Sequence, residues 1–598
     1  METCALIGTN GSIDWCCLPH LESPSVFARI LDSRKGGHFY IRPAGNFESY
    51  QQYIENTNVL QTIFTSGETR VILTDFMPVA ESENREKYRN PAIFRTLDCQ
   101  DEPVKMIAEF RPAFHYARDR AQLELDGHRA KAYTDSESLF LDSQATPRSS
   151  GDSVQYAFTI EPGDEYWFLL RYGAPFPFNP VACETSLQDT IDFWHRWVHS
   201  CDLPSCVFEA PWHDQVVRSG LILKLLTHEE TGAIFAAPTT SLPEAIGGSR
   251  NWDYRFNWIR DASFTIQALH HLGHETEARA FLRWFRDIRK NTRKPADLKI
   301  MYSAHGDRHI EEFQLSYLSG YRDSKPVRIG NGAANQWQLD IYGEIINSVY
   351  ELVRYDQRID GDEWNLIREL VDYVGETWRT RDAGIWEFRN SPRHFVYSKL
   401  MSWVAVDRGI KIAEREQLDA PLEGWRHTRA EIKQTILERG FNKNLNSFVM
   451  YFDSDILDAC TLLIPLMGLI PFYDARVKGT VNAIQEHLAT SNGLVYRYKT
   501  DDGFESEEGA FVICSFWLIM DLIFLQRIDE AEKIFRGMLE YLSPLGLMAE
   551  EIDPETGEQL GNYPQAFSHI GLINAALYLG KARKKSKQVP ELLGLESG

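Results

Sequence analysis

Residues 165–201 read EYWFLLRYGAPFPFNPVACETSLQDTIDFWHRWVHSC, and the spacing of apolar residues changes within them. The first part, 165–173, is a short aromatic and aliphatic run that is typical of a strand. The second part, 185–201, has apolar residues at helical spacing, with Thr185 or Ser186 as the expected N-cap. The change predicts a strand-rich region, then a connecting helix, then a helix-rich region.

Strand-like runs recur upstream of this point, and Gly, Pro, Asn and Asp clusters separate them. No helical segment intervenes to cross a sheet, which favours a sandwich or barrel over βαβ units. Asn10-Gly11-Ser12 predicts a hairpin turn rather than a glycosylation site. The chain opens in the middle of a strand pattern, so we expect an upstream strand or leader to precede it. The runs are 36–43, 58–66, 69–79, 92–98, 105–110, 137–143 and 154–162.

Downstream of residue 205 the apolar spacing becomes helical. The loops between the expected helices differ greatly in length, and the sequence has no repeat of fixed period. A toroid of paired helices, with function gathered on the long-loop side, explains this pattern better than a solenoid does. Helices are expected at 211–228, 261–290, 334–356, 362–379, 397–417, 424–440, 455–468, 474–489, 509–525, 528–542 and 566–583.

Composition and charge restrict the class of protein. A chain of 598 residues is too long for one ordinary core, and 43% hydrophobic with 25% charged residues is typical of a globular protein. The net charge of −22 argues against nucleic-acid backbones and anionic membranes as partners. A neutral or cationic ligand fits this charge, and so does solubility alone.

Cysteines and apolar runs bear on the compartment. The nine cysteines are irregularly spaced and form no CxxC pair, which argues against a zinc site and for reduced thiols. The sequence shows no signal peptide and no apolar stretch of 18 residues. We therefore expect a cytoplasmic protein. The 15 tryptophans are many; they could line sugar subsites or fill a large core, and composition leaves both open.

The stretch NWDYRFNWIRDAS, 251–263, combines aromatic side chains with Arg260 and Asp261 where a loop becomes a helix. Asp261 could simply cap that helix. Alternatively, Asp261 accepts hydrogen bonds from sugar hydroxyls, Arg260 donates to others, and aromatic rings cover a face of the sugar. The residues alone leave both interpretations open. The candidate rings are Trp252, Tyr254 and Trp258.

Glu387 lies between Trp386 and Phe388. Apolar surroundings favour the protonated form of a carboxylic acid, and a proton donor to a leaving oxygen needs that property. We therefore expect Glu387 to be the more desolvated of two catalytic carboxyls. The alternative is an ordinary loop carboxylate that pairs with Arg389 or Arg393.

A second acidic group, Glu550, Glu551 and Asp553, precedes a Gly/Pro loop and a helix. Crowded carboxylates are tolerated on a solvated face, or they are kept for catalysis. Two carboxylates from distant loops, one acting as acid and one as base, are the minimum for cleaving a glycosidic bond.

The whole chain resembles glycoside hydrolase family 15, and most of all its bacterial and archaeal members, which include trehalases, glucodextranases and glucoamylases. The resemblance implies an N-terminal antiparallel β-sandwich at 1–180, a linker helix at 181–209, a catalytic (α/α)6 barrel at 210–585 and a tail at 586–598. The segments that carry it are 5–32, 251–264, 320–344, 384–410, 508–518 and 549–573.

The family's functional residues match positions of this chain. The general acid falls on Glu387 and the general base on Glu550, with Glu551 in the place of a fungal Gln. Fungal glucoamylases have a second Glu directly after the acid, where this chain has Phe388, so the preference for maltooligosaccharides is open. Substrate contacts are expected from Tyr254, Trp258, Arg260, Asp261, Trp386 and Arg497.

The resemblance implies an inverting hydrolysis in which Glu387 protonates the glycosidic oxygen and Glu550 activates a water. Carboxyl groups about 6.5–9.5 Å apart suit inversion, and about 5–5.5 Å suits retention, so we expect the wider separation. Glu551 should face away from the pocket, because consecutive residues of an extended segment point to opposite sides.

The leading hypothesis is an exo-acting, glucoamylase-like α-glucosidase that releases β-D-glucose from non-reducing ends. The alternative is a trehalase. More distant alternatives are a phosphorolytic relative, which would lack Glu550, and a non-catalytic carbohydrate-binding protein. The expected partner is an α-linked glucose oligosaccharide or disaccharide. We expect no cofactor, no metal, no nucleic acid and no membrane, and the sequence leaves a homo-oligomer open.

Overall fold

The computed structural model describes residues 1–79, 91–175, 177–198, 211–354, 358–500, 502 and 508–584. The chain forms two compact units. The first comprises 1–202, 315–327 and 543–546, and the second comprises 203–314, 328–542 and 547–598. The finer boundaries at 180, 209 and 585 stay a prediction.

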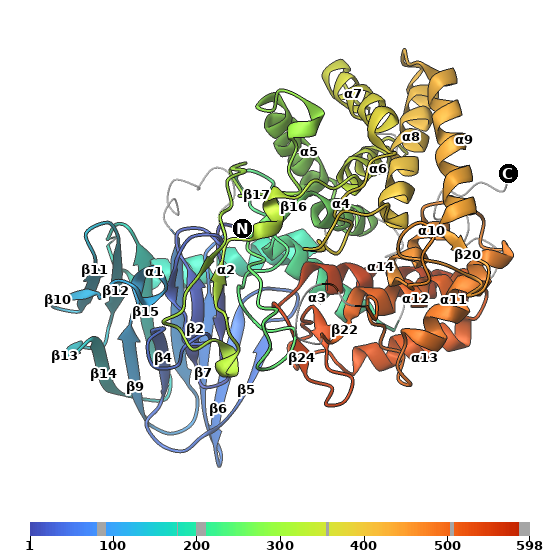
Figure 1. The fold of residues 1–598 in the computed structure, drawn as a ribbon. Helices are drawn as coiled ribbons and strands as arrows, with labels where there is room; N and C mark the ends of the chain where they lie inside the picture. The colour runs from blue at the N-terminus through green and yellow to red at the C-terminus, as the bar shows by residue number, and fades with distance from the viewer. Residues whose placement is uncertain are drawn as a thin grey trace. The chain divides into compact units, whose positions relative to one another are not determined.

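The first unit contains two antiparallel sheets (Figure 1). One has the order β1 (Ala5–Ile7), β2 (Ser12–Cys17), β4 (His38–Pro43), β9 (Val104–Arg111), β14 (Ser153–Ile160) and β13 (Arg148–Ser150), with β3 (Ser25–Phe27) paired to β2. The other has the order β10 (Gln122–Asp126), β11 (Arg129–Tyr133), β12 (Ser138–Ser143), β15 (Glu165–Tyr172), β8 (Ala92–Cys99), β7 (Thr69–Phe76), β6 (Leu60–Ser66) and β5 (Glu48–Tyr53).

Aromatic side chains from both sheets form the core between them. Phe39 of β4 contacts Phe110 of β9 and Phe168 of β15, with ring centroids 5.8 and 6.2 Å apart. Arg95 of β8 is fully buried and donates to Asp75 at 2.6 Å and to the carbonyl of Phe39 at 2.7 Å, so a polar link also joins the sheets. The predicted β-sandwich is confirmed.

The strand predictions overlap β4, β6–β9, β12, β14 and β15, but β3, β5, β10, β11 and β13 were missed. β5 and β10 are edge strands with largely exposed or half-buried residues, so they carry no continuous apolar run. The predicted hairpin is present, because β1 pairs with β2 and Gly11 has a φ of +70° in the turn between them.

Helix α2 (Pro180–Val198) begins before the predicted cap, and that prediction is wrong. The hydroxyls of Thr185 and Ser186 donate to carbonyls four residues earlier, inside the helix. Asn179 accepts from the backbone N–H of Val181 instead, and Pro180 suits the first helical position. Residues 199–209 of the expected linker lie outside the described residues. The first unit also holds the short helix α1 (Phe114–Ala117).

The second unit is mainly helical (Figure 1). Along the chain, helices that are almost wholly buried alternate with amphipathic ones. All 13 residues of α12 are buried, for example, whereas α5 buries one face. This alternation is that of an (α/α)6 barrel. The inner helices are α4 (Ile259–His271), α6 (Asp340–Arg354), α8 (Val396–Glu416), α10 (Leu463–Leu466), α12 (Val512–Phe524) and α14 (Ala566–Lys584). The others are α3 (His213–Leu225), α5 (Glu275–Lys290), α7 (Gly361–Thr377), α9 (Leu422–Arg439), α11 (Ala475–His487) and α13 (Ile528–Leu539).

Two helix predictions differ from the structure. The predicted helix 261–290 is two helices, α4 and α5, because the chain turns at Gly273 with a φ of +88°. The predicted helix 455–468 is a 3-10 turn, Ala459–Leu462, followed by α10. Asp458 starts that turn by accepting from the N–H of Cys460 at 2.9 Å.

Short strands lie on the loops of the barrel. They are β16 (Asn257–Trp258) with β17 (Met301–Tyr302), β18 (Phe313–Gln314) with β19 (Arg328–Ile329), β20 (Phe441–Asn442) with β21 (Ser447–Phe448), and β22 (Ala510–Phe511) with β23 (Glu551–Ile552) and β24 (Gln559–Leu560).

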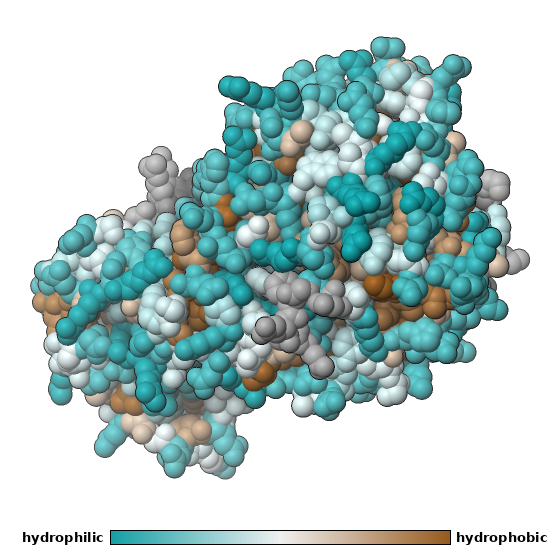
Figure 2. All heavy atoms as spheres, in the orientation of Figure 1, coloured by the Kyte–Doolittle hydropathy of each residue, from teal (hydrophilic) through white to brown (hydrophobic). Residues whose placement is uncertain are grey.

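Hydrophilic side chains cover most of the face drawn in Figure 2. Among the described residues, no helix is both long and apolar enough to cross a membrane. The seven cysteines in the described part of the chain are buried free thiols.

Candidate active site

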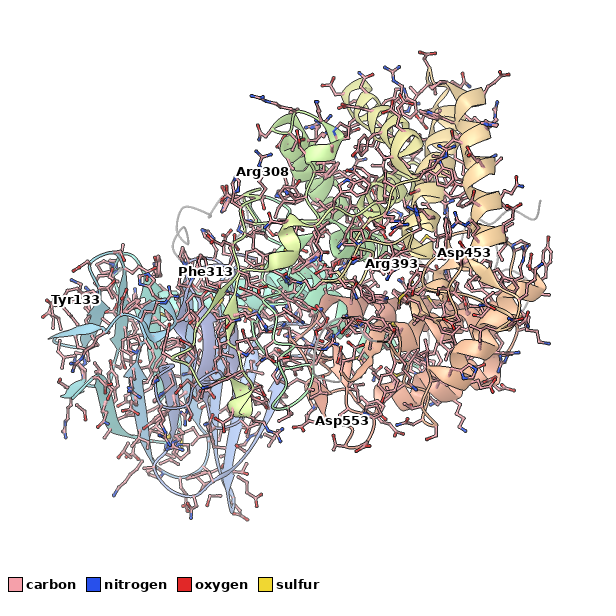
Figure 3. All side chains as sticks on the ribbon, in the orientation of Figure 1. Tyr133, Arg308, Phe313, Arg393, Asp453 and Asp553 are labelled. Atoms are coloured by element: carbon pink, nitrogen blue, oxygen red, sulfur yellow. The ribbon has the colours of Figure 1, made fainter. Side chains whose placement is uncertain are left out.

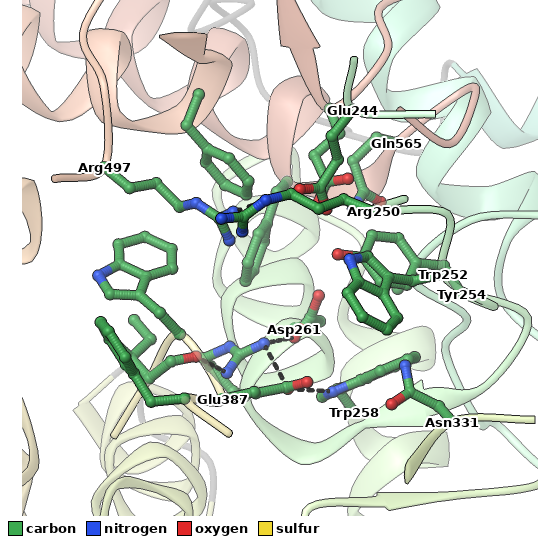
Figure 4. Close-up of a pocket in the computed structure, with 18 of the residues that line it drawn as sticks. Glu244, Arg250, Trp252, Tyr254, Trp258, Asp261, Asn331, Glu387, Arg497 and Gln565 are labelled. Atoms are coloured by element: carbon green, nitrogen blue, oxygen red, sulfur yellow. Dashed lines mark hydrogen bonds and ion pairs between the residues drawn. The ribbon is translucent and has the colours of Figure 1, made fainter. Parts of the chain in front are cut away.

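A cavity with about 710 Å³ of empty space, its open mouth included, lies in the helical unit. Its walls come from the residues that precede or begin the inner helices α4, α8, α12 and α14. The two predicted catalytic carboxyls and all the residues predicted to contact the sugar line it: Trp252, Tyr254, Trp258, Arg260, Asp261, Trp386, Glu387, Arg497 and Glu550. Figure 4 shows Glu387 and Trp258 on one side of the cavity, and Glu244 and Gln565 on the opposite side.

Arg260 and Asp261 occupy the first turn of α4 and are buried. Nη2 of Arg260 lies 3.2 Å from Oδ2 of Asp261, and Nη1 donates to the carbonyl of Ile385 at 2.7 Å. Burial raises the pKa of Asp261 to about 6, although Arg260 opposes the shift. Both side chains belong to the cavity wall, where hydroxyl groups of a sugar could reach them.

Glu387 lies on the loop between α7 and α8 and has a φ of +60°. Gln336 holds this backbone by donating to the carbonyls of Glu387 and Phe388 at 3.0 and 3.1 Å. Oε1 of Glu387 accepts from Trp258 Nε1 at 2.7 Å and lies 3.6 Å from Arg260 Nη2. A left-handed backbone at a non-glycine residue is costly, and such conformations cluster at functional sites.

The expectation that Glu387 would be the more desolvated carboxyl is wrong. Its side chain is 18% exposed, whereas Glu550 is 3% exposed. The residues next to Glu387 in sequence turn away from it: Trp386 donates to Asp458 at 2.9 Å, and Phe388 stacks on Phe395. Neighbours in sequence therefore do not provide the surroundings of this carboxyl.

Glu550 directly precedes β23, and its carbonyl accepts from Val512 N at 3.0 Å. Burial raises the pKa of Glu550 well above its usual range, and the charge of Glu244 adds to the shift. Arg497 and a hydrogen bond from Tyr254 act in the opposite direction. A carboxylate with a raised pKa is a stronger proton acceptor when ionised.

Arg497 connects the cavity to a group of buried carboxylates. Its guanidinium bonds to Glu508 and lies 3.5 Å from Glu244 and 3.7 Å from Glu551. One face of the guanidinium covers Phe511, with 4.7 Å to the ring centroid. These contacts fix the guanidinium at the cavity wall.

The two acids that follow Glu550 are not part of the cavity wall among the described residues. Oε2 of Glu551 accepts from Gly509 N at 2.7 Å, away from the cavity. Asp553 accepts from Glu555 N at 2.8 Å in a turn, and Figure 3 shows it at the edge of the helical unit. Glu550, Glu551 and Asp553 are close in sequence, but each has different neighbours in the structure.

Sequence reasoning missed several residues of the cavity. Glu244 and Arg250 are buried and lie in loop 241–250, which contains Pro and Gly and has no periodic pattern of apolar residues. The argument used for Glu387, that a desolvated acid can serve in catalysis, would have applied to Glu244 as well. Nothing in the sequence marked the other missed residues, although three of the recognised segments contain four of them, all except Tyr498 and Asp502. The missed wall residues include Asn331, Tyr498, Asp502, Phe511, Gln565 and Phe567.

Two family models match the chain. The model of glycosyl hydrolases family 15 covers residues 210–577, and the model of the trehalase-like N-terminal region covers 1–147. The chain belongs to glycosyl hydrolase family 15. It is therefore an enzyme that hydrolyses glycosidic bonds.

Relatives of this family 15 enzyme match almost its whole length. The trehalase of Thermoplasma volcanium is 39% identical over 98% of this chain and 93% of its own. The trehalase of Mycobacterium tuberculosis is 37% identical over 98% and 89%. A solved bacterial glucoamylase, complexed with acarbose, has a TM-score of 0.71 at 14% identity over 98% of this chain and 92% of its own, which establishes a shared fold.

Proposed function

We propose that this family 15 enzyme is a trehalase, which hydrolyses α,α-trehalose to glucose. The observation that carries the proposal is the match to trehalases at 37–39% identity along nearly the whole chain. The similarity to the glucoamylase is a similarity of fold alone. The glucoamylase-like activity that led the sequence analysis is therefore less well supported than its alternative.

The geometry supports two distinct roles for the carboxyl groups. Glu387, beside Trp258 and Arg260, would donate a proton to the glycosidic oxygen as the C1–O bond breaks. Glu550 would take a proton from the water that attacks the same C1 from the opposite face. One glucose then forms as the β anomer, and the other leaves as the α anomer that it already was.

The second sugar would meet a wall that differs from the fungal glucoamylase pattern. Phe388 lines the cavity where that pattern has a carboxylate, and its ring lies 5.2 Å from that of Tyr498 and 5.4 Å from that of Phe395. An apolar ring stack cannot accept hydrogen bonds from a leaving sugar in the way a carboxylate does. This supports a recognition of the second glucose unlike that of maltooligosaccharides.

A substrate panel tests the proposal. We expect glucose from trehalose, and much less from maltose, isomaltose and dextrin, when each is incubated with the enzyme at equal concentration. Preferential hydrolysis of maltose or dextrin would contradict the trehalase assignment and restore the glucoamylase-like one.

A separate experiment measures the anomeric configuration of the released glucose. Proton NMR of fresh product from trehalose should show α- and β-glucose in equal amounts, and in H₂¹⁸O the label should enter the β anomer. A product that is α-glucose only would contradict inversion. The separation of about 6.5–9.5 Å between the two carboxyls stays a prediction that goes with this result.

We retain the cytoplasm as the proposed compartment. The seven buried free thiols in the described part of the chain support a reducing environment.

A further inference from the structure

A group of buried acids lies beside the cavity, and we call Glu244, Asp502, Glu508, Glu550 and Glu551 the acid cluster. Carboxylate oxygens of Glu244, Glu508 and Glu551 lie within 4.8 Å of one another. Among the described residues, Arg250 and Arg497 are the cations that contact the cluster. Four of the five carboxyls, all except Glu550, therefore share these two guanidinium groups, at a site where an unpaired charge is costly.

Hydrogen bonds are distributed unevenly within the acid cluster. Glu508 accepts from both arginines, and Asp502 accepts from Arg250 at 2.6 Å and from Tyr498 at 2.8 Å. Glu551 accepts from Gly509 N. Glu244 is 1% exposed, and neither of its oxygens accepts a hydrogen bond from a described residue. A buried carboxyl without a donor needs an explanation.

A backbone hydrogen bond links the segment of Glu244 to the surroundings of the predicted base, Glu550. The carbonyl of the preceding residue, Pro243, accepts from Gly561 N at 2.8 Å. Gly561 in turn lies so close to Glu550 that an added Cβ would be 2.9 Å from Oε2 of that side chain. This Oε2 is also buried without a hydrogen-bond donor among the described residues. The hydrogen bond between Pro243 and Gly561 thus links the segments that carry Glu244 and Glu550, two carboxyls that lack a full set of hydrogen-bond donors among the described residues.

Two simpler roles for Glu244 fit less well. Both of its oxygens are buried, which disfavours a direct contact with a sugar. A bound cation is also disfavoured, because the Arg497 guanidinium already stands 3.5 Å from Glu244 and 3.7 Å from Glu551 and bonds to Glu508. The role that remains is an electrostatic effect of Glu244 on Glu550.

We propose that Glu244 is a positioning residue for catalysis, whose carboxylate in the acid cluster makes Glu550 a stronger acceptor of the proton from water. The proposal rests on the proposed role of Glu550 as the base. A nearby negative charge disfavours the ionised form of a carboxyl and so increases its affinity for a proton. After burial, the charge of Glu244 is the largest contribution that raises the pKa of Glu550.

Other charges act on the same pair. Asp261 adds to the raised pKa of Glu550, whereas Arg497 and Tyr254 lower it. Burial raises the pKa of Glu244 itself to about 7, with Arg497 and Arg250 opposing and Glu508 and Asp502 adding to the shift. Glu244 is therefore largely ionised above neutral pH, where its charge acts fully on Glu550.

The test is the pH dependence of kcat/KM in Glu244→Gln. Without the neighbouring charge, the pKa of Glu550 falls, so we expect the acidic limb to move to lower pH by about one unit and kcat at the plateau to fall about tenfold. KM should stay within about twofold, because no sugar contact is lost. Glu244→Asp should restore part of both changes.

A matched control is Glu351→Gln, which removes another buried barrel carboxyl that does not line the active-site cavity. Its acidic limb should stay at the wild-type position. An unchanged limb in Glu244→Gln would overturn the proposal; if that variant does not fold, the same criterion applies to Glu244→Asp.

The pH profile of kcat/KM is measured with whichever sugar of the substrate panel the enzyme cleaves. Inactivity on trehalose with activity on maltose would then contradict the proposed substrate, while the shift of the limb still tests Glu244. Full activity of Glu550→Gln would overturn the base assignment and the role of Glu244 with it.

Discussion

The indole N–H of Trp258 donates to Oε1 of Glu387 at 2.7 Å, across 129 positions of sequence. The bond places the predicted proton donor beside Arg260, at the start of α4. It also sets the direction of the carboxyl, since the loop backbone of Glu387 is held separately by Gln336. The aromatic stretch 251–263 therefore orients the acid as well as lining the cavity.

Trp258→Phe removes this bond and keeps an aromatic ring. A hydrogen bond to a charged group contributes about 1.5–3 kcal/mol, so we expect kcat/KM to fall about 10- to 100-fold with little change in thermal stability. Trp403→Phe is the control, because Trp403 is a buried tryptophan of α8 whose N–H has no partner among the described residues. Equal effects of the two substitutions would contradict a directing role for Trp258.

Glu387→Gln should reduce kcat for trehalose by at least about 10³-fold and leave KM nearly unchanged, because a proton donor acts in the transition state. Fluoride leaves without a proton, so the variant should retain much of its activity on α-glucosyl fluoride. Glu550→Gln should lose activity on both substrates. Loss of fluoride hydrolysis in Glu387→Gln, with retention in Glu550→Gln, would reverse the two roles.

Glu551→Gln tests the register of the base. Glu551 does not line the cavity and contacts Gly509 N and Arg497, so we expect a loss of about 10-fold or less, whereas Glu550→Gln should lose about 10³-fold or more. Steady-state kinetics on trehalose measures both. If Glu551→Gln is inactive and Glu550→Gln is active, the base is Glu551 and not Glu550.

Gly561→Ala should displace the base. The new Cβ would meet Cβ and Oε2 of Glu550 at 2.9 Å, so we expect a large fall in kcat in a protein that still folds. Gly557→Ala is a matched control: its φ of +73° resembles the +79° of Gly561, but the nearest atom to its Cβ is 3.5 Å away, on Tyr541. Backbone strain alone should affect both variants equally, and a selective loss of kcat identifies contact with Glu550.

Acid should destabilise the enzyme through buried histidines. Burial lowers the pKa of His569 to about 3, so its neutral form is favoured in the folded protein. Its contribution to stability is present above the ordinary pKa near 6.5 and is lost as pH falls toward 3, by about 1.4 kcal/mol per pH unit. His569→Asn should flatten this dependence of the unfolding midpoint in that window. An unaltered slope would show that His569 is not the titrating group.

The sequence by itself determined the two-part architecture. Apolar spacing distinguishes strands before residue 173 from helices after 210, because a strand buries every second residue and a helix every third or fourth. It also identified the acids and the Arg260-Asp261 pair, since such polar residues among aromatics are unusual and match a family. Apolar spacing could not predict edge strand β5, because an exposed strand has few apolar residues. It could not predict the start of α2 either, because both Asn179 and Thr185 are residues that can cap a helix.

Only the tertiary structure decided the surroundings of each acid. Glu387 is flanked in sequence by Trp386 and Phe388, yet its carboxyl meets Trp258 and Arg260, while Glu550 is the more buried of the two. Glu244 gave no signal in its loop, yet the hydrogen bond between Pro243 and Gly561 links that loop to a residue packed against Glu550. Burial and charge depend on residues brought together from distant segments, and these determine the pKa of a carboxyl.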